Sequence, residues 1–425
     1  MLHYLKSKAF AGLVGTMAAL AVVAMFAMSA SAQDKKPIKI GFGMAQTGPL
    51  GPNGKSAMLA MDIWVEETNA KGGLLGRPVE LVHYDDQSNP STVPGIYTKL
   101  LDVDKVDLIV GGYGTNLLAP AMPVVMQRKK TFLGLFGLDV NHEFHYDRYF
   151  AMIPTGPTPT TSFTQGFFDT AMAQNPKPKT VAIVAADAEF SKNASDGARQ
   201  NAKKAGLKIV YDKSYPPSTT DFSPIVRAIQ ATNPDLVVIC SYPLDSVGMV
   251  LAVNEAKFTP KMIGGGMVGL QSTVFKVKLG PALNGFMNYD FWLPAKSMMF
   301  DGTDAFMKKY QERAAKAGVD PLGYYMAPWG YAYLQVLGDA ITATKSLDDA
   351  KLAAYMHSHS FDTVVGKIKF AASGEWAQGR VLQAQFRGIK GHDAAEFKNP
   401  ATEVVITPAQ YKSGSLIYPY AKAHQ

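Results

Sequence analysis

Apolar and polar positions alternate in two short segments near the start of the chain, and a longer segment with different spacing lies between them. Ile38–Phe42 and Val79–Tyr84 have the period of two that is typical of strands. From Ser56 to Asn69 the apolar residues are spaced two to four positions apart, and the length of this segment favours a helix. A strand–helix–strand unit of this length places its strands parallel in one sheet. The opening of the chain therefore predicts an α/β fold.

The loop between the first strand and the helix is expected to lie at the ligand-binding edge of this sheet. Thr47–Gly54 contains three glycines and two prolines, so regular structure is not expected there. Ligands of open α/β sheets bind in crevices at the carboxyl ends of the strands, where this loop lies. The helix is expected to end at Gly72-Gly73, because glycine readily adopts the left-handed conformation of a helix C-cap.

The alternation of strand and helix patterns continues through the chain. We expect strands at Val106–Val110, Thr131–Phe136, Thr180–Ala185, Leu207–Tyr211 and Asp235–Cys240, and helices at Thr92–Leu101, Ala119–Arg128, Asn193–Ala205, Ser223–Ala231, Phe306–Ala317 and Ala327–Thr344. Loops are expected at Asp187–Ser191 and Ser241–Ser246. The chain is expected to cross between two halves at Ile153–Pro159, Asn288–Pro294 and Phe361–Phe370.

Several motifs of the opening unit together resemble one protein family. They are Thr47-Gly48-Pro49, Asn69-Ala70-Lys71-Gly72-Gly73, Gly76 and Asp85-Asp86. In these motifs the chain resembles the type I periplasmic solute-binding proteins of ABC importers, in the leucine/isoleucine/valine-binding branch. The resemblance implies two Rossmann-like lobes with parallel-sheet cores and a three-strand hinge. Lobe 1 is then expected at 33–154 plus 289–362, and lobe 2 at 155–288 plus 363–425.

The glycine-rich segment Gly111–Asn116 follows an expected strand and is a candidate binding loop. Its three glycines allow a ligand to approach the backbone, and Thr115 or Asn116 could cap the next helix. The resemblance implies that the Thr115 hydroxyl binds a ligand carboxylate. A plain helix cap remains the alternative.

The resemblance also implies a set of further contacts from later loops. Besides Thr115 and Asn116, the expected site residues are Gly137 through its carbonyl, the aromatic residues Phe190, Tyr242 and Tyr325, and Asn53, Asp139 and Gly266. Packing at the edge of the core is the alternative for Phe190, and packing along a helix face is the alternative for Tyr325. Tyr242 lies within one position of the family's aromatic contact.

Two positions differ from the family pattern in a way that bears on charge. Asp139 replaces a hydroxyl, and an ionised aspartate repels a carboxylate. Gly266 stands where amino-acid-binding members have a glutamate that neutralises the ligand ammonium. A buried ammonium without a carboxylate is unfavourable, so Asp139 or Asp245 would have to replace that glutamate if the ligand is an amino acid. Asp139 could instead cap the following helix.

The N-terminus has the three parts of a secretory signal. Lys6 and Lys8 precede an apolar run, Ala9–Met28, and Ala30-Ser31-Ala32 forms a cleavage site. We expect residues 1–32 to be removed after Ala32 and the mature protein to be periplasmic. The alternative is an uncleaved membrane anchor, because the run is nearly long enough to span a bilayer.

Composition excludes several other classes of function. The formal charge of +7 is spread along 425 residues, which disfavours nucleic-acid binding. Cys240 is the only cysteine, so no internal disulfide forms. The spacing of His142 and His145 is not that of a metal site, and no GxSxG, HExxH, CxxC or Walker motif occurs.

The sequence therefore predicts a binding protein without cofactor, metal or catalytic residues. By resemblance it is a monomeric receptor that closes on a small amino-acid-like, amide or organic-acid ligand and delivers it to an inner-membrane ABC permease. The alternative is a ligand sensor that signals to a receptor or regulator.

Overall fold

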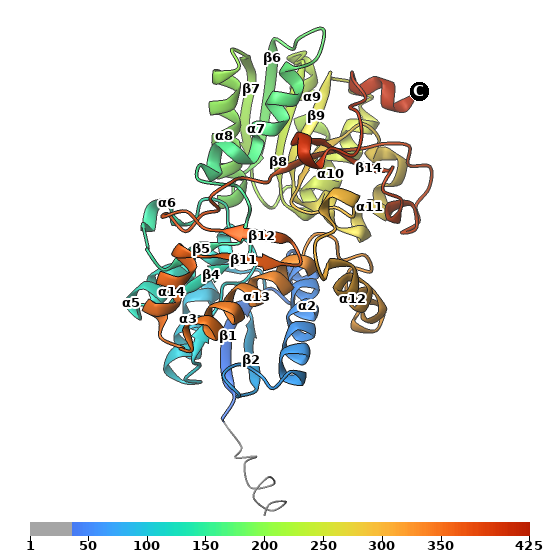
Figure 1. The fold of residues 1–425 in the computed structure, drawn as a ribbon. Helices are drawn as coiled ribbons and strands as arrows, with labels where there is room; N and C mark the ends of the chain where they lie inside the picture. The colour runs from blue at the N-terminus through green and yellow to red at the C-terminus, as the bar shows by residue number, and fades with distance from the viewer. Residues whose placement is uncertain (1–35) are drawn as a thin grey trace, which may run out of the picture.

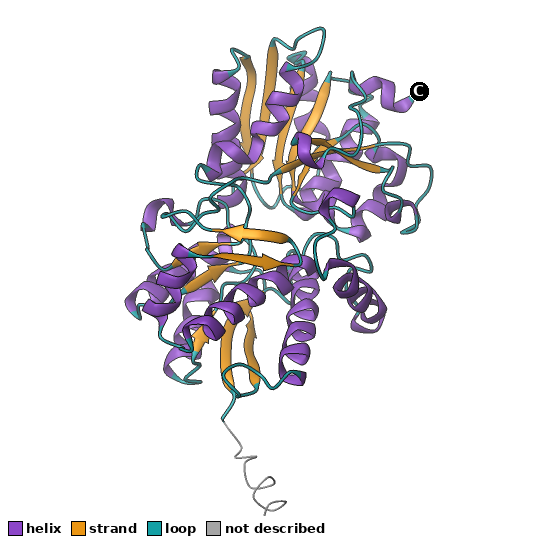
Figure 2. Cartoon of the chain, viewed as in Figure 1, coloured by secondary structure: helices purple, strands orange, loops and turns teal. Residues whose placement is uncertain are grey.

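The described chain, residues 36–425, forms two α/β lobes stacked along the long axis of the molecule (Figure 1). In this computed structural model, lobe 1 is built on the parallel sheet β2-β1-β3 and lobe 2 on a sheet in the order β14-β13-β10-β9-β8-β6-β7. Helices flank both sheets (Figure 2). The predicted two-lobe α/β fold is confirmed. The expected signal and its cleavage after Ala32 lie outside the described residues. Within residues 36–425, none of the helices is long and apolar enough to cross a membrane.

Lobe 1 contains the opening strand–helix–strand unit. Its strands are β1 (Ile38–Met44), β2 (Val79–Asp85), β3 (Leu108–Ile109), β4 (Phe132–Gly134) and β5 (Tyr149–Ala151), and its helices are α2 (Gly51–Ala70), α3 (Val93–Asp102), α4 (Thr115–Leu118), α5 (Met122–Gln127), α6 (Asn141–Phe144), α12 (Thr303–Ala317), α13 (Ala327–Thr344) and α14 (Asp349–Ser358). β1 pairs in parallel with β2 and β3, as predicted, and β4 pairs in parallel with β5. The Gly111 amide donates to the Leu133 carbonyl at 2.7 Å, which joins the chain after β3 to β4.

The start of α2 differs from the prediction. The helix begins at Gly51, within the segment that was expected to be an irregular loop, rather than at Ser56. Pro52 is compatible with this start because the backbone N–H groups of the first helical turn form no hydrogen bonds within the helix. Gly54 lets the turn pass close to the chain after β1, since a Cβ there would lie 1.8 Å from the Ala45 carbonyl oxygen.

Lobe 2 repeats the alternation of strand and helix. Its elements are α7 (Pro159–Met172), β6 (Thr180–Ala186), α8 (Glu189–Lys204), β7 (Lys208–Tyr215), α9 (Ser223–Ala231), β8 (Leu236–Ser241), α10 (Pro243–Glu255), β9 (Met262–Met267), α11 (Thr273–Leu279), β10 (Met287–Asp290), β13 (Leu382–Phe386) and β14 (Glu403–Thr407). Strands β6 to β10 are parallel, and β13 and β14 form an antiparallel edge. α8 and α10 begin inside segments that were predicted to be loops, so Phe190 lies in the first turn of α8.

The third predicted crossing is wrong, because Phe361–Phe370 contains a hairpin. β11 (Ser360–Thr363) pairs antiparallel with β12 (Gly366–Lys369). Gly366 has a φ of +89°, and the Thr363 hydroxyl donates to its carbonyl at 2.7 Å, which closes the turn. The chain reaches the lobe 2 sheet only at β13. Arg380, just before β13, donates its amide to the Pro154 carbonyl at 2.7 Å, so this crossing runs beside the first one.

Candidate functional site

A small cavity lies between the two lobes, at the carboxyl ends of strands from both sheets. Its lining consists of Leu50, Tyr113, Gly114, Thr115, Asn116, Phe136, Leu138, Ile153, Phe163, Phe190, Tyr242, Val268, Tyr289, Phe291 and Tyr325. The cavity volume is about 30 Å³, enough for roughly one or two water molecules. A larger solute can therefore enter only if the lobes part or the lining side chains move.

Aromatic rings form most of the cavity wall. Phe136 packs against Phe291 with ring centroids 4.9 Å apart, and Phe163 packs against Tyr289 at 4.6 Å. Phe190 meets Tyr242 nearly edge to face at 5.9 Å. These rings come from both lobes and from the second crossing, so the wall is assembled only when the lobes are together. Its chemistry suits the apolar body of a small solute.

Tyrosine hydroxyls supply part of the polar chemistry of the cavity. The hydroxyls of Tyr289 and Tyr325 are 3.1 Å apart, and the Tyr113 hydroxyl accepts a hydrogen bond from Asn53 Nδ2 at 3.0 Å. Burial raises the pKa of Tyr113 to about 12 and that of Tyr242 above its ordinary value. These groups are therefore neutral at physiological pH and can donate hydrogen bonds.

Thr115, to which the resemblance assigns carboxylate binding, lines the cavity. It is the first residue of α4, after Gly114, whose φ of +108° turns the chain into the helix. The Thr115 hydroxyl oxygen accepts from the Leu138 amide at 3.0 Å. Because Gly114 occupies the N-cap position, the alternative in which Thr115 is a plain cap is wrong. A hydroxyl that accepts one hydrogen bond still has a proton to donate to a ligand.

The cavity has no ionised side chain in its lining. Asp139 instead lines a separate hollow of about 360 Å³ with His142, His145 and Glu375. Its carboxylate accepts a hydrogen bond from the Thr160 hydroxyl of α7, and its φ is +60°. Asp245 also lies outside the cavity and accepts from the Tyr215 hydroxyl at 3.1 Å. The described residues contain no cluster of side chains suited to a metal ion.

The predicted site residues divide into two groups. Thr115, Asn116, Phe190, Tyr242 and Tyr325 line the cavity, whereas Asn53, Gly137, Asp139 and Gly266 do not. Asn53 lies behind Tyr113 and fixes its hydroxyl. A Cβ at Gly137 would meet Val140 and Leu118 within 2.7 Å, and one at Gly266 would meet the Ile239 carbonyl oxygen at 3.0 Å. Both glycines therefore have packed surroundings, and their expected ligand contacts stay predictions.

Sequence reasoning missed five aromatic residues of the wall: Tyr113, Phe136, Phe163, Tyr289 and Phe291. Tyr113 and Phe136 carried a usable signal, because each lies at or just after the end of an expected strand. Tyr289 and Phe291 lay in a segment that was read only as a crossing. Phe163 gave no local signal, since it belongs to α7 and reaches the cavity through the packing of lobe 2.

A second hollow, of about 190 Å³, opens beside the cavity. It shares Leu50, Asn116 and Tyr242 with the cavity, and Pro49 and Pro217 also line it. The Asn116 Oδ1 atom is buried and has no partner among the described residues. The shared side chains show that this hollow adjoins the cavity, and Asp245 also contributes to its lining.

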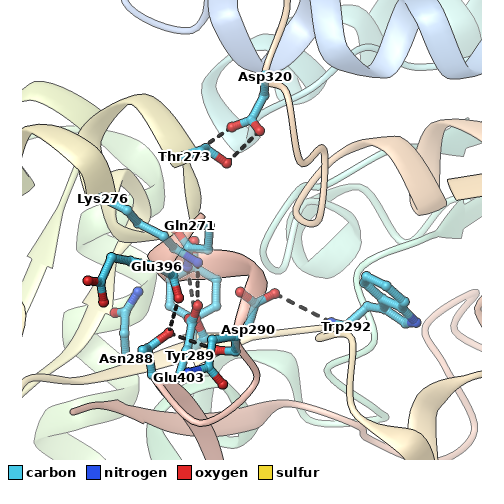
Figure 3. Close-up of polar contacts among 12 residues, drawn as sticks. Gln271, Thr273, Lys276, Asn288, Tyr289, Asp290, Trp292, Asp320, Glu396 and Glu403 are labelled. Atoms are coloured by element: carbon cyan, nitrogen blue, oxygen red, sulfur yellow. Dashed lines mark hydrogen bonds and ion pairs between the residues drawn. The ribbon is translucent and has the colours of Figure 1, made fainter. Parts of the chain in front are cut away.

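A buried polar network surrounds the end of β10, which carries Tyr289 (Figure 3). Phe291 follows this strand directly. Lys276 forms an ion pair with Glu403, and their side chains are only 3% and 10% exposed. Asp290 Oδ1 accepts from the Phe291 amide at 2.7 Å, whereas Oδ2 has no partner among residues 36–425. Burial raises the pKa of Asp290 to about 8. The Gln271 side chain donates to the Tyr289 carbonyl at 2.9 Å, so the backbone that carries the aromatic wall is fixed.

Contacts between the lobes close the site. Asn193 of α8 donates to the Leu138 carbonyl at 2.9 Å, and Thr160 of α7 donates to Asp139. At the other side, the Thr273 amide donates to Asp320 Oδ2 at 2.7 Å (Figure 3). The described conformation is therefore a closed one.

Comparison with known proteins places this geometry in a wider group. The model of a family described as periplasmic binding protein matches residues 37–390. A Leu/Ile/Val-binding protein homolog 7 of Brucella abortus (strain 2308) is 27% identical over 345 residues, which cover 78% of this chain and 83% of the relative.

Solved structures share the fold. A leucine-binding protein of Thermotoga maritima has a TM-score of 0.72 at 20% identity, over 84% of this chain and 96% of that protein. A solute-binding protein of an ABC transporter from R. palustris, solved in complex with 4-hydroxybenzoate, also has a TM-score of 0.72 at 20% identity, over 84% of this chain and 94% of that protein.

Proposed function

Because this chain belongs to the periplasmic binding protein family, we propose that it is the solute-binding receptor of an ABC importer. The observation that carries the proposal is the cavity enclosed between two lobes, with side chains from both in its wall. A ligand that touches both lobes stabilises the closed form by its differential contacts. The permease would then receive the solute from the closed receptor.

We infer that the ligand is an organic acid with an apolar or aromatic body rather than an amino acid. No carboxylate lines the cavity itself to neutralise an ammonium group. Asp139 accepts a hydrogen bond from Thr160, and Asp245, which lines the adjoining hollow, accepts one from Tyr215. The Thr115 and Tyr242 hydroxyls can donate to a carboxylate, and the aromatic wall can hold a ring or an alkyl chain. The complex of the R. palustris neighbour with 4-hydroxybenzoate supports this class, whereas the name of the Brucella relative favours amino acids.

The setting of the receptor follows from the same proposal. Residues 1–32 would direct export and be removed after Ala32, which places a monomeric receptor in the periplasm beside an inner-membrane permease. The lobe division at 33–154 plus 289–362 and 155–288 plus 363–425 is retained as a proposal, with one change. The last boundary moves beyond the β11–β12 hairpin, because its two strands pair with each other. No catalytic step is needed.

Matched ligand pairs test the ligand class. Leucine and 4-methylpentanoate share a carbon skeleton and a carboxylate but differ in the ammonium group, as do phenylalanine and 3-phenylpropanoate. We expect the deaminated acid of at least one pair to bind about tenfold more tightly than its amino acid, because it leaves no buried ammonium unpaired. Calorimetry and the ligand-dependent rise in melting temperature measure this difference. Tighter binding of the amino acid in both pairs would refute the inference.

A further inference from the structure

Arg380 is a buried cation without a counterion. It lies on the third crossing between the lobes and is 5% exposed. Its Nη1 atom donates to the Val365 carbonyl at 2.6 Å, but Nε and Nη2 have no hydrogen-bond partner within residues 36–425. A buried charge is unfavourable unless it is paired, and two donor nitrogens of this guanidinium lack a partner among the described residues.

Aromatic rings hold the guanidinium in place. Its central carbon lies 5.1 Å from the centroid of the Trp376 ring, 5.4 Å from those of Phe300 and Trp329, and 6.0 Å from that of Tyr411. Contacts of this kind attract a cation through the face of the ring, but they satisfy no N–H group. Burial lowers the pKa of Arg380 to about 10, while the nearby Tyr411 hydroxyl favours the charged form. Arg380 therefore remains protonated at neutral pH.

Arg380 lines a large hollow that is distinct from the cavity described above. The hollow has a volume of about 920 Å³, and no residue of the cavity wall belongs to it. Trp329 separates the two spaces, since its ring packs on Phe136 of the cavity wall at 5.3 Å and also contacts Arg380. Phe306 and Tyr331 of lobe 1 and Tyr411 of the segment after β14 contribute to the lining.

We propose that Arg380 anchors a second binding site, which takes the carboxylate of an organic monoanion with an apolar body. The planar guanidinium presents paired N–H donors that match a carboxylate, and the rings of Phe300, Phe306, Tyr331 and Tyr411 provide apolar surface for the rest of the molecule. Glu67, Asp301 and Asp362 line the same hollow, and their charge disfavours a multiply charged anion such as phosphate. This inference stands on the hollow and does not depend on the ligand of the cavity.

Fluorine NMR with 4-fluorobenzoate as the probe tests the site in solution. We expect wild-type protein to give a resonance of bound 4-fluorobenzoate. Arg380→Met should remove this resonance or lower the affinity for the probe at least tenfold, whereas Lys367→Met should leave the affinity within about twofold of wild type. Lys367 lines the same hollow but is exposed and paired with Asp362, so it is a matched control for the loss of one positive charge. Inorganic phosphate at equal concentration should not displace the probe.

The outcomes separate this site from the cavity. A bound resonance that is unaffected by Arg380→Met reports only the cavity, and if no resonance depends on Arg380 the proposal is wrong. Acetate serves as the carboxylate competitor. If phosphate displaces the bound probe as effectively as acetate does, the stated ligand class is wrong. Arg380→Met should melt no lower than wild type, because it removes an unpaired buried charge. If that variant does not fold, Arg380→Lys is the substitute. It keeps the positive charge but lacks the planar guanidinium, so it should still weaken binding of the probe.

Discussion

At the scale of single residues, Asp139 has a structural environment that its position in the sequence did not reveal. It was a candidate partner for a ligand ammonium, but its carboxylate accepts from Thr160 across the interface between the lobes. Its φ of +60° favours Asp, Asn or Gly. These contacts indicate a role in lobe closure.

Substitution of Asp139 separates closure from charge recognition. Asp139→Asn retains an acceptor for Thr160 and tolerates the left-handed backbone, so we expect ligand affinity to stay within about twofold. Asp139→Ala loses the contact and should weaken binding by about threefold to tenfold, the effect of one lost hydrogen bond. Calorimetry with the tightest ligand of the matched pairs measures both variants. An equal, large loss in both would show that the negative charge itself binds the ligand.

We expect Asp290 to make the stability of the protein depend on pH. Its pKa is about 8 in the folded protein against an ordinary value of 3.8, so the folded state holds a proton that the unfolded state has lost between these pH values. Stability contributed by this protonated form is complete below about pH 4, decreases as the pH rises towards 8, and changes no further above that. The whole decrease is on the order of a few kcal/mol.

Asp290→Asn should flatten this dependence. The asparagine side chain keeps an oxygen that can accept from the Phe291 backbone amide, and it cannot ionise. We therefore expect the variant to be more stable than wild type at pH 8, and the difference in stability to be smaller at pH 5. Urea unfolding midpoints at the two pH values provide the measurement. Parallel pH profiles for the variant and the wild type would rule out Asp290 as the titrating group.

At the scale of elements, local pattern determined most helices but not their starts. α13 runs from Ala327 to Thr344 as predicted, because most of its residues are apolar over a length typical of a helix. α2 begins earlier than predicted, and the expected third crossing is the β11–β12 hairpin. In α2 a proline and a glycine that read as breakers are accommodated in the first helical turn, and in the hairpin Gly366 forms the turn between two paired strands. Spacing of apolar residues alone does not reveal either arrangement.

A pair of glycines tests this explanation for α2. Gly54→Ala should destabilise the protein by about 2 kcal/mol or more, because the new methyl group would overlap the Ala45 carbonyl oxygen and the start of the helix must shift. Gly95 lies in the first turn of α3, where an added Cβ would have no atom within 4 Å. Gly95→Ala should therefore stabilise the folded protein by about 0.5–1 kcal/mol. Chemical denaturation measures both, and similar effects at the two positions would contradict the close approach at Gly54.

At the scale of the whole molecule, the sequence predicted two lobes and several of the residues that line the cavity between them. It did not predict that the cavity is mainly aromatic, because Phe163, Tyr289 and Phe291 come together only through the packing of lobe 2 and the second crossing. Nor did it predict that the closed form leaves only about 30 Å³. Closure of the lobes and admission of the ligand must therefore alternate.

Distances between spin labels test this alternation most directly. Lys55 of lobe 1 and Ser218 of lobe 2 are exposed, and the native Cys240 is buried, so Lys55→Cys and Ser218→Cys can be labelled selectively. Pulsed electron paramagnetic resonance should show longer and broader distances in the ligand-free protein and a shorter, narrower distribution with saturating ligand. Identical distributions with and without a ligand that calorimetry shows to be bound would contradict capture by closure of the two lobes.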